Sequence, residues 1–169
     1  YLGGATPLAS MVKGFEIEEL PEFIDFLRRQ VRGQGVELKL GKEFDLSALA
    51  EAKPEVIVLA LGGVPVYPDV PGLDGRNVIK TSDLYSVLRF FLRFLTPRSM
   101  RALTKLWMPV GKKVVIIGGA IQGCQLGEFL TKRDREVTIV DTGEELGAGL
   151  VPERKTRLFY WFGKKGVPV

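Results

Sequence analysis

The run KKVVIIGGAIQGCQLGEFLTKRDREVTIVD, residues 112–141, constrains the fold of this chain more than any other feature. Residues 113–117 and 136–140 are short apolar stretches that suit strands, and residues 122–132 between them suit a helix. Glycines separate the first strand from the helix. Strand, glycine turn, helix and strand in this order form a βαβ unit, so an α/β fold with a parallel sheet is predicted.

The turn resembles a G-x-G-x-x-G fingerprint in which one glycine is replaced. Its six positions are Gly118, Gly119, Ala120, Ile121, Gln122 and Gly123. Asp141 ends the second strand 18 residues after Gly123, close to the spacing of about 20 expected for an acid that binds a ribose. This context predicts a Rossmann-like dinucleotide site, and the alternative is a βαβ turn with a structural role only.

Each residue type has a physical reason in such a site. Gly118 permits the tight turn, Gly123 permits close packing of helix on strand, and the helix N-terminus attracts a pyrophosphate. A carboxylate at Asp141 accepts hydrogen bonds from ribose hydroxyls and repels a 2′-phosphate, so NAD(H) is expected over NADP(H). Ala120 stands where a glycine brings the backbone close to the phosphates, so we expect a usable but weaker site.

Cys124 is the single cysteine and follows the last glycine of the turn. A helix N-terminus lowers a thiol pKa, so a reactive thiolate is one interpretation. Packing as a small buried apolar residue is the favoured one. The chain has no histidine, which excludes Cys-His zinc sites and histidine proton relays. No catalytic residue and no metal ligand is predicted.

Composition narrows the class of protein further. A net charge of +4 is too small to indicate nucleic-acid binding. One cysteine suits a reducing compartment such as the cytoplasm. No apolar run reaches the roughly 18 residues of a membrane span, and no signal-peptide pattern opens the chain. The first residue is Tyr1, and we expect the chain to be a piece of a longer protein.

Several further elements are predicted outside the βαβ unit. Helical spacing of apolar residues predicts a helix over 20–35, and another is expected over 153–165. Strands are predicted at 36–40, at 54–63, where a continuous apolar run suits burial on both faces of a sheet, and from Val167 onward. Residues 64–75 hold three prolines and two glycines and are expected to form an irregular connector.

Residues 84–108 are expected to form two short helices interrupted at Thr96-Pro97. The segment is basic and has no acidic residue. One interpretation is an amphipathic helix on a membrane surface or an acidic partner. The favoured interpretation is a helical linker whose apolar face packs on the domains that it joins.

The motifs VIIGGAIQGCQLGEFL, REVTIVD, LALGGVPVYPDVPGL and LGGATPLASMVKGFE together resemble the C-terminal half of the NADH:flavin oxidoreductases. This group includes 2,4-dienoyl-CoA reductase, 2-enoate reductase and trimethylamine dehydrogenase. The resemblance implies the C-terminal part of an FAD-type domain over 1–79, a helical linker or insertion over 80–110 and the N-terminal part of an NAD(P)-type domain over 111–169. It also implies an N-terminal barrel domain of the same parent, carrying FMN and a [4Fe-4S] cluster, and is compatible with a homo-oligomer.

By this resemblance, Gly3 and Gly4 correspond to a flavin-side glycine segment, and Gly62 corresponds to the glycine of an A-T-G motif whose threonine is Leu61 here. Gln125 stands where the family commonly has a glutamate near the nicotinamide or flavin. The expected cofactors are NAD(H) and FAD, or ADP in place of FAD.

The leading functional expectation is a part of a flavin-dependent NADH oxidoreductase that binds the dinucleotide and passes hydride to a flavin. A non-catalytic adenine-nucleotide-binding or scaffold module is the alternative, favoured by the changes at Ala120 and Gln125. In either case, the chain is not expected to turn over a substrate alone.

Overall fold

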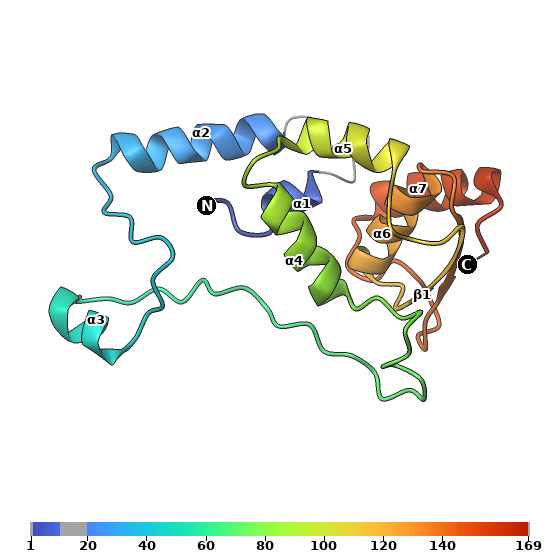
Figure 1. Cartoon of the computed structure of the whole chain (residues 1–169), viewed down its shortest axis with the longest axis horizontal. Coiled ribbons are helices and arrows are strands. Elements are labelled where there is room, and N and C mark those ends of the chain that lie inside the picture. The colour runs from blue at the N-terminus through green and yellow to red at the C-terminus, as the bar shows by residue number, and fades with distance from the viewer. Residues whose placement is uncertain (1, 11–19, 169) are drawn as a thin grey trace.

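The computed structural model describes residues 2–10 and 20–168 (Figure 1). Helices predominate, and the strands lie near the C-terminus. In chain order the elements are α1 (Thr6–Ala9), α2 (Leu20–Gly33), α3 (Leu46–Ala52), α4 (Thr81–Phe91), α5 (Pro97–Leu106), β1 (Lys113–Ile117), α6 (Ile121–Thr131), β2 (Glu136–Val140) and α7 (Pro152–Lys165).

The C-terminal part is built on the βαβ unit expected from the sequence. β1 and β2 pair in parallel along their whole length, beginning with Lys113 opposite Glu136. Ile116 and Ile139 point to the same face and are buried, because α6 and α7 cover that face. On the opposite face Val115 and Ile117 remain exposed. The fold class is therefore α/β with a small parallel sheet, as predicted.

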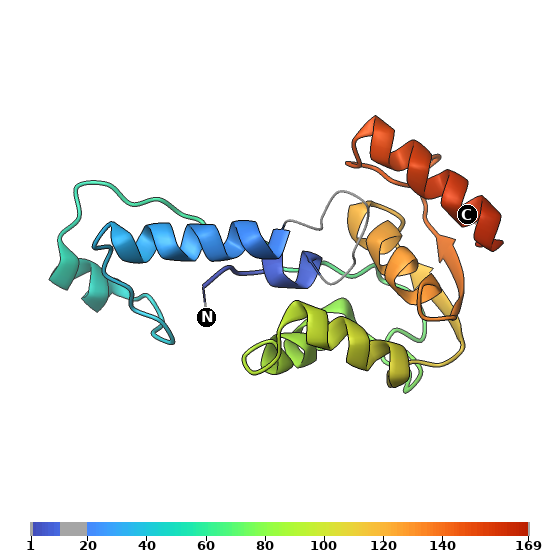
Figure 2. The same cartoon turned by 90° about the horizontal axis from the view of Figure 1, so that it is seen from above.

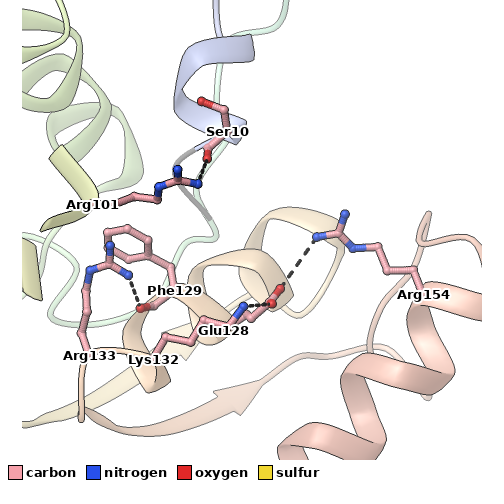
Figure 3. Close-up of polar contacts among 7 residues, drawn as sticks. All are labelled: Ser10, Arg101, Glu128, Phe129, Lys132, Arg133 and Arg154. Atoms are coloured by element: carbon pink, nitrogen blue, oxygen red, sulfur yellow. Dashed lines mark hydrogen bonds and ion pairs between the residues drawn. The ribbon is translucent and has the colours of Figure 1, made fainter. Parts of the chain in front are cut away.

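α6 and α7 pack closely on each other and on the sheet. Gly127 permits this approach, since a Cβ there would lie 2.8 Å from Ile139 Cδ1 and 3.4 Å from Phe162 Cζ. Phe162 is fully buried. An ionic contact adds to the packing, because the nearly buried Glu128 of α6 pairs with Lys132 and, at 3.8 Å, with Arg154 of α7 (Figure 3).

The predicted break at Thr96-Pro97 is confirmed. Pro97 occupies the first turn of α5, where its missing N–H costs nothing, and the Thr96 hydroxyl accepts the Ser99 N–H at 3.2 Å. Met100 is buried in the core of the C-terminal part. Four apolar residues of α4 and the turn after it pack against that core: Tyr85, Leu88, Leu92 and Leu95. The linker role of this segment stays a prediction.

Arg133 connects the pair of helices α4 and α5 to the βαβ unit, through a contact with α5. Its guanidinium donates to Thr104 Oγ1 of α5 at 3.0 and 2.9 Å. It also donates to the Phe129 carbonyl at 2.9 Å (Figure 3). The same group lies 3.4 Å from the centre of the Phe129 ring. In α5, Arg101 donates to the Ser10 carbonyl at 3.3 Å, which ties the N-terminal residues to this pair.

Two predicted strands do not form. Residues 36–40 and 54–63 are extended or irregular, and neither pairs with another described segment. Their apolar pattern suits burial, but a strand requires a neighbouring backbone to complete its hydrogen bonds. Most of the large apolar residues of 54–66 are strongly exposed instead, with Val58 at 83% and Leu61 at 87%. Figures 1 and 2 show this segment and α2 extending away from the βαβ unit.

The third strand expected from Val167 is also not formed at 167–168. Pro168 nevertheless lies beside β2, because its carbonyl accepts the Ile139 N–H at 3.3 Å. The rest of this prediction, at Val169, lies outside the described residues, as does the second part of the LGGATPLASMVKGFE motif, residues 11–16. Within 2–10 and 20–168, no helix has both the length and the apolar character needed to cross a bilayer.

Candidate nucleotide-binding site

The glycine turn joins β1 to α6, and two of its glycines are required by geometry. Gly118 has φ +105°, which favours glycine, and its N–H continues the sheet by donating to the Val140 carbonyl at 2.8 Å. At Gly123 an added Cβ would lie only 1.7 Å from the Gly118 carbonyl oxygen. The first turn of α6 therefore contacts the backbone of the turn directly.

Gly119 is also closely packed, but its contact is with a side chain and not with backbone. A Cβ at this position would lie 2.0 Å from Leu146 Cδ2, because the loop after β2 folds over the turn. Ala120, at the position of the replaced glycine, is the N-cap of α6 with φ −68° and ψ −169°. Any L residue adopts this conformation, and Ala120 is exposed. The alanine thus leaves the backbone of the turn undistorted.

Backbone N–H groups at the start of α6 form the part of the turn that could bind an anion. Ile121 N–H donates to the Ala148 carbonyl at 3.2 Å, and Gly119 N–H donates to Asp141. For Ala120, Gln122 and Gly123, no N–H partner is found in the described part of the chain. Unpaired N–H groups at a helix N-terminus, with the partial positive charge of the helix dipole, suit a phosphate.

Asp141 lies at the end of β2, directly beside the glycine turn. Its Oδ2 accepts the Gly119 N–H at 2.5 Å and its Oδ1 accepts the Gly143 N–H at 2.8 Å. These two hydrogen bonds, that from Gly119 first, hold the pKa of the Asp141 carboxyl below its ordinary value of 3.8. The group is therefore an anion at neutral pH, and each of its two oxygens accepts one backbone hydrogen bond.

The loop 142–149 completes the surroundings of the turn, and sequence reasoning missed its role. Gly147 N–H donates to the Gly119 carbonyl at 2.6 Å, and Leu146 packs on Gly119. Three glycines in seven residues, Gly143, Gly147 and Gly149, are the signal that could have indicated a loop in close backbone contact. Both backbone polar groups of Gly119 are therefore hydrogen-bonded: its N–H to Asp141 at the end of β2, and its carbonyl to Gly147 in the loop.

Cys124 has the packing role favoured from the sequence. Its side chain is fully buried, and the Sγ–H donates to the Gly119 carbonyl at 3.1 Å. Burial is the main cause that raises the pKa of the Cys124 thiol, which opposes thiolate formation. Gln125 lies half-buried one turn into α6.

The other predicted cofactor residues lie away from this turn along the chain. Gly3 and Gly4 have φ +116° and +54° in the turn before α1, and a Cβ at Gly3 would contact Ile24 of α2. Gly62 has φ +78° within the exposed extended segment, with no atom within 4 Å of an added Cβ. Their flavin-side role stays a prediction.

The sequence is similar to parts of several proteins that are named as oxidases or reductases. The chain is 26% identical over 167 residues to an NADH oxidase of Thermoanaerobacter brockii, covering 99% of this chain and 23% of that protein. It is 24% identical over 145 residues to a bilirubin reductase of Mediterraneibacter gnavus, covering 86% and 19%. A nitric oxide reductase FlRd-NAD(+) reductase of Klebsiella pneumoniae is 28% identical over 112 residues, covering 66% and 26%.

The fold has a counterpart among solved structures. A 2-naphthoyl-CoA reductase in complex with 2-naphthoyl-CoA superposes with a TM-score of 0.70 at 22% identity, over 95% of this chain and 22% of that one. This chain thus spans about a quarter or less of each of these proteins. The sequence profile of the pyridine nucleotide-disulphide oxidoreductases matches residues 24–169. The chain therefore belongs to the pyridine nucleotide-disulphide oxidoreductase family.

Proposed function

We propose that this chain is the nucleotide-binding part of a flavin-dependent NADH oxidoreductase, with the dinucleotide pyrophosphate at the glycine turn. The observation that carries the proposal is the set of N–H groups without a partner among the described residues, at Ala120, Gln122 and Gly123. They lie at the carboxyl end of β1, beside the anionic Asp141. The residues present therefore fit a dinucleotide, since carboxyl ends of parallel strands are where α/β sheets bind such ligands.

The bound dinucleotide would supply the hydride, and the chain's own residues would bind and orient it. The helix N-terminus neutralises phosphate charge, and Asp141 favours an unsubstituted ribose, hence NAD(H) over NADP(H). The family and the NADH oxidase relative support an oxidoreductase with FAD as partner cofactor. FMN, a [4Fe-4S] cluster and an enoate, dienoyl-CoA or amine substrate follow only from the resemblance of the sequence motifs, and they would belong to other parts of the parent protein.

A second candidate is a module that binds adenine nucleotide without redox chemistry. It is favoured by the state of two groups at the turn: the Cys124 thiol is buried with a raised pKa, and both carboxylate oxygens of Asp141 accept backbone N–H groups. Reduction of a bound flavin by NADH in the intact protein, followed by its absorbance, separates the two candidates.

The proposed site is tested by comparing two glycine substitutions in a calorimetric titration with NADH. Gly123→Ala places a methyl 1.7 Å from the Gly118 oxygen and should abolish binding. Gly163→Ala, in α7, meets nothing within 4 Å and should bind like the wild type. Circular dichroism establishes that both variants are folded. Equal NADH binding by both folded variants would contradict the proposal.

A further inference from the structure

The Asp141 carboxylate bridges the glycine turn and the loop after β2. Its two oxygens accept one N–H each, from Gly119 at 2.5 Å and from Gly143 at 2.8 Å. Gly119 precedes the N-cap of α6, and Gly143 is the second residue of the loop 142–149. One side chain thus holds two backbone segments at fixed separation.

The same loop also binds the carbonyl group of Gly119. Gly147 N–H donates to the Gly119 carbonyl at 2.6 Å, and the Ala148 carbonyl accepts the Ile121 N–H at 3.2 Å. Cys124 Sγ donates to the Gly119 carbonyl as well, at 3.1 Å. These bonds fix the peptides on both sides of Ala120, and therefore the direction in which the unpaired N–H groups of α6 point.

We infer that Asp141 is a positioning residue for phosphate recognition: it acts through Gly119 to hold the glycine turn in its binding conformation, in addition to any contact with a ribose. The inference rests on the proposed nucleotide site and states how that site is organised. A turn that is ordered before binding loses less conformational entropy when the phosphate arrives, which increases affinity. Loss of Asp141 should therefore weaken binding of phosphate groups whether or not a ribose hydroxyl is present.

The test compares two nucleotides that differ only in the ribose hydroxyls. ADP and 2′,3′-dideoxyadenosine 5′-diphosphate are titrated into the wild type and Asp141→Ala. A hydrogen bond to a charged group is worth about 1.5–3 kcal/mol, so we expect both ligands to bind Asp141→Ala at least about tenfold more weakly. Unchanged affinity for the dideoxy nucleotide, with a loss for ADP alone, would overturn the inference and leave Asp141 as a ribose ligand only.

A matched control separates the loss of the Asp141 hydrogen bonds from the loss of one negative charge. Glu144 lies in the same loop, is exposed, and its carboxylate makes no hydrogen bond or ion pair within the described residues. Glu144→Ala removes the same charge close to the site and should leave the affinity for both nucleotides within about twofold of the wild type. An equal loss in Glu144→Ala and Asp141→Ala would show that the loss is not specific to Asp141 and would overturn the inference.

A measurement without ligand keeps the inference separate from the proposed function. The Gly119 amide is followed by hydrogen exchange and by its proton chemical shift. With Asp141→Ala it should exchange at least about tenfold faster and move upfield, while the Gly127 amide inside α6 stays unchanged. If no nucleotide binds but Gly119 responds in this way, the proposed function fails and the positioning role stands. A Gly119 amide that is indifferent to Asp141 overturns the positioning role.

Discussion

Arg133 is a buried cation, 6% exposed, that makes its polar contacts only with neutral partners among the described residues. Burial, followed by the charge of Arg101, lowers the pKa of Arg133 to about 10. It is still protonated at pH 7, so a charge is held where water is mostly excluded. The planar guanidinium compensates by bonding to Thr104 and Phe129 and by stacking on the Phe129 ring.

We predict that Arg133→Lys destabilises the protein by about 1–3 kcal/mol, because an ammonium cannot make these forked contacts and remains a buried charge. Arg133→Met, which removes the charge and keeps an apolar chain, should lose less stability than Arg133→Lys. Urea unfolding followed by circular dichroism measures both. Wild-type stability in Arg133→Lys would contradict this account of the contact.

A second prediction at this scale concerns pH. The folded-state pKa of Asp141 is lowered by hydrogen bonds from Gly119 and Gly143. Stabilisation by such a group is present above its unfolded pKa, near 3.8, and is lost as pH falls through the lower folded value. The Gly119 amide shift should therefore titrate with a midpoint below 3.8 and stay constant from pH 5 to 7. A midpoint above 4 would contradict the hydrogen-bond assignment.

At the scale of elements, sequence patterns succeed where local contacts complete the structure. β1 and β2 have the predicted bounds, and α5 begins at Pro97 as predicted. The glycine turn was also predicted, but the contacts of Leu146 and Gly147 with Gly119 were not, because they depend on how a loop folds back in space. The strands predicted at 36–40 and 54–63 fail because periodicity does not supply a neighbouring strand.

Hydrogen exchange should separate the two kinds of segment. Amides of 54–63 are in extended chain without ladder partners among the described residues, so we expect exchange close to the rate of an unstructured peptide. Central amides of β1 and β2 should be protected at least about a hundredfold more strongly. Protection of 54–63 equal to that of β1 in the isolated chain would contradict the arrangement described above.

Packing of α6 on β1 makes a further prediction about stability. Gly123→Ala must displace backbone, since its Cβ would meet the Gly118 oxygen, and should cost more than about 2 kcal/mol. Gly163→Ala, at an open position in α7, should instead stabilise the protein by about 0.5–1 kcal/mol through helix propensity. Urea unfolding of both variants tests this difference, and similar free energies of unfolding would contradict the close α6–β1 contact.

At the scale of the whole molecule, exposed apolar surface is distributed unevenly. The segment 54–66 and the sheet face at Val115 and Ile117 are open, while the opposite face of the sheet is covered by α6 and α7. The chain spans 19–26% of the relatives compared above. These surfaces suit contact with further protein, and we predict no steady NADH oxidation by the 169-residue chain alone. Absorbance at 340 nm with added FAD measures this directly, and sustained turnover would contradict it.

The central claim is that the turn at the end of β1 binds a dinucleotide through backbone N–H groups, and nuclear magnetic resonance during an NADH titration tests it most directly. We predict saturable shifts of the Ala120, Gln122 and Gly123 amides, larger than the shift of Gly163 in α7, and a weaker response to NADPH. If these three amides stay unmoved while NADH is added, or move no more than Gly163, the glycine turn has only a structural role.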